Sequence, residues 1–476
     1  MKPKRSYTIL LFLFAIVSSI SCKNKEEILP QLSVSTASVT FLAEGGISNI
    51  TLTSNAQWNI SNPASSWLQL SQTTGNSSSA TIQLTTVLNS SGATRSAVLV
   101  VSSPNGQARR ITVSQDSQMY PSYNTSPKTS DVTGMNSSAV QLADKIKVGW
   151  NIGNTMEASG GETGWGNPLI TEDYIKFVKQ NGFNAIRIPC SWNQYSDKKT
   201  ARLQDAWLNR VKEVVQYCVS NDMYVLLNIH WDGGWLENNC TLVKKDSVNA
   251  KQKAFWEQIA TTLRDFDEHL MFASANEPNS NGSVAQMDVL LSYHQTFVNA
   301  VRSTGGRNLH RVLVVQGESD LMNAFPADPT ANRIMFEEHN YTPFQFTALS
   351  QDASWGKMFH YWGTHHSSIE PDRNATWGEE SDQDAYFQKI KTKFVDKGIP
   401  VIMGEYGAYR RGASSNGPKD LETHNASIDY WITYVTKQAI AHGIKPFFWD
   451  TGGALDRRNN TVLDQRTINA IIAGSK

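Results

Sequence analysis

The chain has 476 residues, of which 40% are hydrophobic and 18% are charged, a composition typical of a globular protein with room for more than one domain. Its 43 Lys and Arg residues balance 43 Asp and Glu residues, so the formal net charge is zero. Without a basic excess the chain offers no electrostatic footprint for a nucleic acid, and acidic polymers are poor candidates as ligands. A neutral ligand is expected instead.

The first 22 residues are predicted to be a targeting signal. Basic residues precede a short apolar run over residues 9–17, and the small-residue stretch "SSISC" then ends at Cys22. This pattern resembles a lipoprotein signal peptide in which Cys22 is lipidated and residues 23–31 form a charged tether. The expected location is the outer face of an outer membrane. Periplasmic or secreted protein is the alternative, because Ser19 stands where the usual lipobox has Leu.

Residues 32–117 are predicted to form a small all-β domain. They are rich in Ser, Thr, Asn and Val, and short alternating segments such as "ATIQLTTV" and "SAVLVVSS" are separated by turn residues. An immunoglobulin-like sandwich fits this pattern. The positions of Trp58, Trp67 and Gly75 and the closing "ITVSQ" resemble a BACON module, and both tryptophans are expected in its core. Polar residues 118–135 are predicted to be a linker.

Residues 136–476 are predicted to form a (β/α)8 barrel. Eight strand-like apolar runs alternate with helix-length amphipathic stretches, a pattern typical of parallel strands with crossover helices. The stretch 171–182 has Thr171 as an expected N-cap and Gly182 as an expected stop. Residues 205–222 are a second expected helix. The usual dinucleotide fingerprint is absent from the sequence, so an open doubly wound sheet is less favoured.

Polar residues close most of the predicted strands. In a barrel of this class the carboxyl ends of the strands meet at one mouth, where the chemistry occurs. The polar or aromatic residues at these ends are Arg187, His230, Asn276, Glu277, His339, Tyr341, Glu405 and Trp449. Two glutamates on separate strands are what glycosidic bond cleavage requires, because one carboxyl protonates the leaving oxygen while the other attacks or activates water. Glu277 and Glu405 are the predicted pair.

Six short motifs in strand order resemble glycoside hydrolase family 5, the cellulase family of clan A. They are "RIP", "NIHWDGGW", "NEP", "EHNY", "GEYG" and "FFWD", and the opening "GWNIGNTMEA" resembles the branch with endoglucanases and xyloglucanases. The resemblance implies a retaining mechanism, with Glu277 as the acid/base and Glu405 as the nucleophile. The acid needs a raised pKa to hold its proton near neutral pH.

The resemblance also implies roles for the other residues at the mouth. Arg187 is the cation expected to keep Glu405 ionised, and Tyr341 would donate a hydrogen bond to the nucleophile. Trp449 would be the stacking surface beneath the reacting sugar. Two histidines and an amide, His230, His339 and Asn276, would bind sugar hydroxyls or tune the acid. His230 is followed by Trp231 where close relatives often have a second histidine, which removes one expected hydroxyl contact.

The expected substrate is β-1,4-glucan of plant cell walls, cleaved in an endo-acting manner. Xyloglucan, mixed-linkage glucan and β-mannan are the alternatives, since loops rather than strand ends select among them. A surface glycan-binding protein is the non-enzyme alternative. The polysaccharide is the expected partner, with no nucleic acid, a membrane contact only through the lipid anchor, and a monomeric chain.

Other chemical classes find little support in the sequence. It contains no H-E-x-x-H motif, no Cys/His cluster with zinc spacing and no G-x-S-x-G elbow, so neither a metal nor a cofactor is expected. Apart from Cys22 three cysteines remain, Cys190, Cys218 and Cys240, an odd number that gives no disulfide framework. They are expected to be buried.

Overall fold

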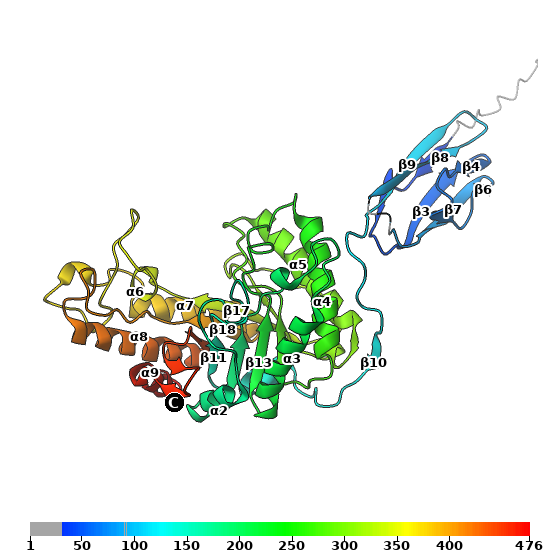
Figure 1. Ribbon diagram of the computed structural model, residues 1–476. Coiled ribbons are helices and arrows are strands. Elements are labelled where there is room, and N and C mark those ends of the chain that lie inside the picture. Colours follow the sequence, from blue (N-terminus) through cyan, green and yellow to red (C-terminus); the bar gives the residue numbers. More distant parts are fainter. Residues whose placement is uncertain (1–30, 90, 92) are drawn as a thin grey trace, which may run out of the picture. The chain divides into compact units, whose positions relative to one another are not determined.

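The computed structural model describes residues 31–89, 91 and 93–476. The chain divides after Gln118 into two compact units, which are described separately (Figure 1). The predicted signal peptide, the lipidation site Cys22 and the tether up to residue 30 lie outside the described residues. In the part of the chain that is described, none of the helices is both long and apolar enough to cross a membrane.

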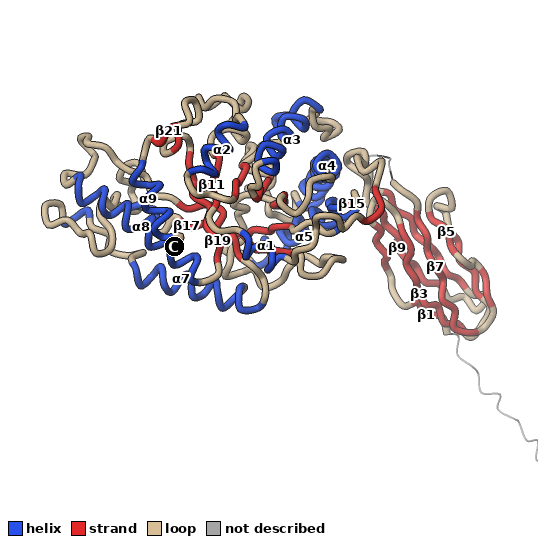
Figure 2. Tube along the Cα trace, turned by 90° about the horizontal axis from the view of Figure 1, so that it is seen from below, coloured by secondary structure: helices blue, strands red, loops and turns tan. Residues whose placement is uncertain are grey.

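The N-terminal unit is a sandwich of two sheets with an apolar core between them (Figure 2). One sheet has the order β1 (Leu32–Val34), β3 (Gly46–Ser54), β7 (Ser78–Thr86) and β5 (Leu68–Leu70). The other has the order β2 (Ser38–Phe41), β9 (Ala108–Gln115), β8 (Arg95–Ser102), β4 (Trp58–Ser61) and β6 (Thr74–Gly75). Alternating burial along β3, β7 and β8 gives each sheet one inner and one outer face.

Both tryptophans of the sandwich pack within it. Trp58 is 3% exposed, and a Cβ on Gly75 would overlap its indole ring, so glycine is required at that position. Trp67 is partly buried against the core, and the guanidinium of Arg95 lies 4.6 Å from its ring centroid. The expectation that both serve the core is confirmed.

The second unit contains a closed barrel of eight parallel strands, as predicted (Figure 1). Apolar residues fill its lower interior, among them Leu226, Met271, Met335 and Phe447. The strands in barrel order are β11 (Gly149–Ile152), β12 (Ala185–Ile188), β13 (Tyr224–Asn228), β14 (Leu270–Ala273), β16 (Leu313–Gln316), β17 (Ile334–Asn340), β18 (Val401–Tyr406) and β19 (Ile444–Asp450).

Helices surround these strands (Figures 1 and 2). Thr171 caps α2 (Glu172–Gln180) as predicted, since its hydroxyl accepts from the N–H of Tyr174 at 3.2 Å, and Gly182 follows the helix with φ +98°. Cys190, Cys218 and Cys240 are buried and free. The helices are α1 (Ala139–Lys145), α2 (Glu172–Gln180), α3 (Asp205–Ser220), α4 (Lys245–Leu263), α5 (Val284–Ser303), α6 (Phe344–Thr347), α7 (Glu380–Lys393), α8 (Leu421–Ala441) and α9 (Gln465–Gly474).

The segment expected to be a linker packs on the second unit over most of its length. The carboxylate of Glu257 in α4 accepts from the N–H of Tyr123 at 2.6 Å, and the hydroxyl of Tyr123 donates to the carbonyl of Thr200 at 2.7 Å. Further along, β10 (Lys128–Ser130) pairs with β15 (Gly305–Gly306). These partners lie far away in sequence, so local composition contained no sign of them.

Candidate active site

The carboxyl end of the barrel is organised by one buried arginine. Arg187 on β12 is 0% exposed, and its Nη1 donates to Oε1 of Glu405 on β18 at 2.8 Å. Its Nη2 donates to Oδ1 of Asn276, just after β14, at 2.6 Å. The structure therefore brings together three residues that the sequence predicted at separate strand ends. A buried guanidinium with such partners fixes the position of each group it binds.

Two further residues hold Arg187, and neither was predicted from the sequence. Nε of Arg187 lies 2.9 Å from Oε1 of Glu337, which is also 0% exposed, and Nη1 donates to Oδ1 of Asn151 at 3.0 Å. Gly404 provides the space for Glu337, since a Cβ on Gly404 would overlap the carboxylate. Two carboxylates thus balance one buried cation, and the pairing offsets the cost of burying these charges.

Glu405 is held by both of its oxygens. Oε1 accepts from Arg187, and Oε2 accepts from the hydroxyl of Tyr341 at 3.0 Å. Burial and the nearby charge of Glu405 hold the pKa of Tyr341 well above its usual value, so the phenol remains a neutral donor. The side chain of Glu405 is 7% exposed, and the residue lines a cleft. A carboxylate fixed in this way is suited to attack a substrate atom in the cleft.

Glu277 has an unusual backbone conformation. Its φ is +46°, a left-handed value that a non-glycine residue adopts only when its surroundings impose it. The side-chain oxygen of Gln316 accepts from the N–H of Glu277 at 2.6 Å and holds this turn. The side chain is 56% exposed, so its carboxyl group is open to the cleft while its backbone is fixed.

A histidine carries the proton beside Glu277. Nδ1 of His339 lies 2.8 Å from Oε1 of Glu277, and its Nε2 lies 3.1 Å from Oε1 of Glu337. Burial alone would lower the pKa of His339, but the charge of Glu405 and the bonds to Glu277 and Glu337 raise it to about 10. Protonated His339 therefore donates from both ring nitrogens.

The pKa of Glu277 differs from the sequence-based expectation. The hydrogen bond from His339 lowers the pKa of this carboxyl from its ordinary 4.5, although burial acts in the opposite direction. The expectation of a raised pKa is therefore wrong for this structure, because it did not include a cation in contact with the acid. The proton nevertheless remains within the 2.8 Å hydrogen bond between the two residues.

His230 and Trp449 form an aromatic wall of the site. Their rings are stacked with centroids 5.8 Å apart and planes at 10°. Burial lowers the pKa of His230 to about 3, so this ring is neutral. Oδ1 of Asn228 accepts from the N–H of Cys190, so its amide nitrogen donates to Nδ1 of His230 at 3.1 Å. The proton of His230 therefore lies on Nε2, which is available to donate to a ligand.

The spacing of the carboxyl groups favours one stereochemical course. Single side-chain atoms of Glu277, His339 and Glu405 all lie within 4.8 Å of one another. Retaining glycosidases place their two carboxyl groups about 5–5.5 Å apart, whereas inverting enzymes need about 6.5–9.5 Å for an intervening water. The short separation in this protein fits direct attack by a carboxylate.

The same three residues form the one group of potential metal ligands with this spacing among the described residues. Protonation of His339 occupies both of its nitrogens, and the guanidinium of Arg187 lies 2.8 Å from Glu405. A metal ion would have to displace that proton and lie beside a fixed positive charge. The donor set therefore fits proton transfer better than metal binding.

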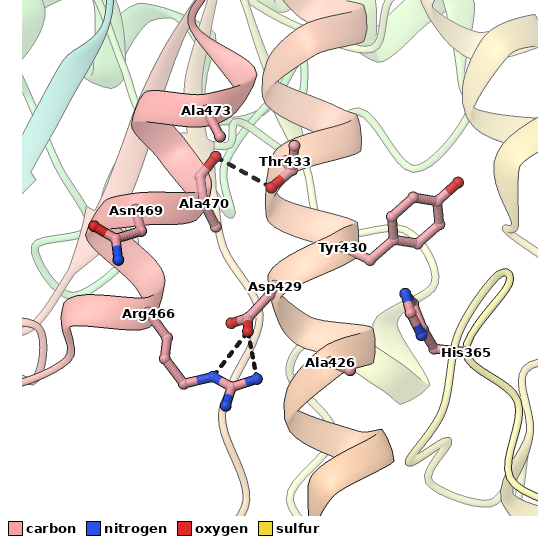
Figure 3. A pocket seen from close by; sticks show the side chains of 9 residues that line it. All are labelled: His365, Ala426, Asp429, Tyr430, Thr433, Arg466, Asn469, Ala470 and Ala473. Atoms are coloured by element: carbon pink, nitrogen blue, oxygen red, sulfur yellow. Dashed lines mark hydrogen bonds and ion pairs between the residues drawn. The ribbon is translucent and has the colours of Figure 1, made fainter.

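A cleft of about 660 Å³ opens above these residues. Glu277, Glu405, His230, His339 and Asn276 all contribute to its lining. A second hollow, of about 510 Å³, lies between α8 and α9, where Asp429 pairs with Arg466 at 2.8 Å (Figure 3). It contains none of the residues predicted for the site, and the rest of its lining is mainly alanine and neutral side chains.

Comparison with known proteins gives consistent matches to both units of the chain. The family described as cellulase (glycosyl hydrolase family 5) matches residues 150–454, and a putative N-terminal binding domain named BACON matches residues 57–116. A xyloglucan-specific endo-β-1,4-glucanase of Bacteroides ovatus is 33% identical over 98% of this chain and 96% of its own length. Endoglucanase B of Clostridium cellulovorans is 33% identical over 70% of this chain and 75% of its own length.

Solved structures give the same result. A Bacteroides ovatus family 5 xyloglucanase in complex with a XXXG heptasaccharide has a TM-score of 0.70 and 31% identity, covering 94% of this chain and 100% of that chain. The similarity therefore includes both the sandwich and the barrel.

Proposed function

This chain belongs to glycosyl hydrolase family 5, and we propose that it cleaves β-1,4-glucan chains internally with Glu405 as the nucleophile and Glu277 as the acid/base. One observation carries the assignment of the two roles. One oxygen of Glu277 lies within 4.8 Å of one oxygen of Glu405 at the mouth of the barrel, and the surroundings of the two carboxyl groups differ. Glu405 is held by an arginine and a tyrosine, whereas Glu277 shares a proton with a histidine.

In the first step an oxygen of Glu405 attacks the anomeric carbon while the bond to the leaving oxygen breaks. Arg187 and Tyr341 hold the carboxylate in place for this attack. Glu277 gives a proton to the leaving oxygen. A bound glycan excludes water from the exposed carboxyl group of Glu277, and the loss of water raises its pKa. The proton of His339 therefore moves along the hydrogen bond to Glu277 before Glu277 passes it to the leaving oxygen.

In the second step Glu277, now a carboxylate, takes a proton from water. The oxygen of that water attacks the anomeric carbon, and the ester bond to Glu405 breaks. Two inversions give net retention of the anomeric configuration. After the second step the proton on Glu277 returns to His339, which lies 2.8 Å from Glu277 and 3.7 Å from Glu405.

Three other residues would bind the reacting sugar. Nε2 of His230 and the amide nitrogen of Asn276 are available as donors, since the other polar atom of each already has a partner. The indole of Trp449 stacks on His230 at the edge of the site, and Gly153 leaves room for it because a Cβ there would lie 2.8 Å from the ring. These contacts would position the sugar without taking part in the bond changes.

Xyloglucan is the first substrate to test. The Bacteroides ovatus relative that matches almost the whole chain is described as xyloglucan-specific, whereas other relatives are described as endoglucanases. Both groups act on a β-1,4-glucan backbone, so the reaction at the mouth is the same. Mixed-linkage glucan and β-mannan are the remaining candidates.

The test is release of reducing ends by the protein lacking residues 1–22. Xyloglucan, carboxymethylcellulose, barley glucan and mannan are compared in parallel, with Glu405→Ala as the inactive control. Activity on a glucan that is lost in the control supports the proposal. A folded protein that releases no reducing ends from any of the four polysaccharides, yet binds one of them, would instead be a glycan-binding protein.

We also propose that the chain is an exported lipoprotein with the sandwich (residues 32–117) as a stalk for the catalytic domain (136–476). The signal-like segment and the match to a BACON-bearing relative from Bacteroides ovatus support this arrangement. Labelling with a radioactive fatty acid would test it. Label that disappears in Cys22→Ala supports lipidation, and an unlabelled wild-type chain contradicts it.

A further inference from the structure

One buried carboxyl group beside the cleft has no use in the reaction described above. Glu237, in the loop after β13, is 2% exposed, and neither of its oxygens has a hydrogen-bond partner in the described structure. The N–H groups of Leu236 and of Glu237 itself lie near enough to favour its charge but not in hydrogen-bond geometry. Glu337 and Glu405, by contrast, are paired with Arg187. A buried polar group without a partner requires an explanation.

Glu237 is a hydrogen-bond donor near neutral pH. Burial, with the negative charges of Asp232 and Glu277, raises its pKa to about 8. A protonated carboxyl offers one O–H donor and an accepting carbonyl oxygen. This pair of functions matches a sugar hydroxyl, which both donates and accepts.

An exposed indole lies in the same loop. Trp231 is 47% exposed and lines the cleft. The turn beneath it is fitted to the ring, because Gly234 has φ +66° and a Cβ there would lie 2.7 Å from the indole. A fixed, exposed indole is suited to stacking against the apolar face of a sugar.

Both side chains belong to the part of the cleft wall that extends past Glu277. Pro278 and Asn279, which directly follow Glu277, line the cleft together with Trp231 and Glu237. The carbonyl of Glu237 accepts from the N–H of Asn279 at 2.9 Å, so the two loops are joined. Since Glu277 gives its proton to the leaving oxygen, the wall beyond it faces the sugar that leaves.

We propose that Trp231 and Glu237 form the binding subsite for the leaving-group sugar, Trp231 by stacking and Glu237 by hydrogen-bonding one of its hydroxyl groups. The inference rests on the proposed function. Turning the Glu237 side chain toward the cleft breaks no hydrogen bond, because it has none, and the ligand supplies the missing partner. Binding energy from this sugar then assists the first step, because it positions the leaving oxygen under Glu277.

Two substrates with different leaving groups test the subsite. Cellotetraose has a sugar as its leaving group, whereas β-cellobiosyl fluoride has a single atom that cannot reach either side chain. We expect Trp231→Ala and Glu237→Leu each to lower kcat/KM for cellotetraose by about 10-fold. For the fluoride, kcat/KM should stay within about 2-fold of wild type. Glu237→Gln keeps a donor and an acceptor and should retain most of the activity on cellotetraose.

Glu157→Gln is the matched control. Glu157 is also buried, and burial raises its pKa to about 7, but its oxygens already accept from the N–H groups of Asn154 and Thr155. This change should lower Tm and should change kcat/KM for both substrates by the same factor. An equal loss on both substrates in the Trp231 and Glu237 variants would overturn the subsite, as would no loss on either. Wild-type protein inactive on both substrates, and on the polysaccharides, would instead overturn the proposed function.

Discussion

Glu337 is expected to be the structural residue on which the site depends most. The change Glu337→Gln keeps the shape of the side chain but removes its charge, which leaves Arg187 with Glu405 alone as its carboxylate partner and takes one anion from His339. Removing one partner of a fully buried ion pair costs about 3–5 kcal/mol. At roughly 2 °C per kcal/mol for a domain of this size, Tm should fall by about 6–10 °C. Activity should fall about 10²-fold as Arg187 and Glu405 shift.

Differential scanning calorimetry of the full chain would follow the transition of the barrel unit, with kcat measured on the preferred glucan. Glu338→Gln is the control, because Glu338 is the neighbouring carboxyl on β17 and points to the other side of the strand, where it contacts Ser319. Its Tm should change much less. If Glu337→Gln melts within 1 °C of wild type and remains active, the role assigned to this ion pair is wrong.

A second variant tests the same contact from the other side. A Cβ on Gly404 would overlap the carboxylate of Glu337, so Gly404→Ala should displace that group. Both changes then damage one interaction, and their effects on unfolding free energy should not add in the double variant. Full additivity would show that Gly404 acts through some other contact.

Three further outcomes are expected. Tyr341→Phe removes the hydrogen bond to Glu405 and should lower kcat about 10- to 100-fold with little change in Tm, so unchanged kcat would contradict its assigned role. The pKa of His339 is raised from 6.5 to about 10 in the folded protein, so its charge stabilises the fold fully below pH 6.5, and this contribution is lost as pH rises toward 10. The difference in unfolding free energy between wild type and His339→Phe should therefore shrink from pH 6 to pH 9.5, and a constant difference would contradict the assignment. Gly153→Ala should raise KM by displacing the Trp449 ring, which steady-state kinetics would detect, and an unchanged KM would show that the ring accommodates the methyl group.

The barrel could be predicted because its signals are local. Each strand is a short apolar run, and the helices between them have caps such as Thr171 that can be recognised in the sequence. The carboxyl ends of parallel strands must meet, so Arg187, Glu277 and Glu405 could be placed at one mouth although they are far apart in sequence. The packing of residues 119–135 could not be predicted, since it depends on long-range partners such as Glu257.

Two features of the site were not predicted from the sequence. Glu337 could have been found, because His339 was expected to face the mouth and residues two apart on a strand share a face. Glu337 is followed directly by a second glutamate, Glu338. Composition alone does not tell which of the two faces the interior of the barrel. The lowered pKa of Glu277 could be predicted only if His339 was known to be protonated. The protonation of His339 depends in turn on the three carboxylates around it.

The role of Glu405 as nucleophile is tested most directly by identifying the residue that becomes attached to the sugar. With 2-deoxy-2-fluoro-β-cellobiosyl fluoride as substrate, the second step is slowed more than the first, so the covalent intermediate accumulates. The labelled protein can then be digested and its peptides sequenced by mass spectrometry. One sugar adduct per chain is expected, on the peptide that contains Glu405. An adduct on Glu277 or on any other residue would contradict this role.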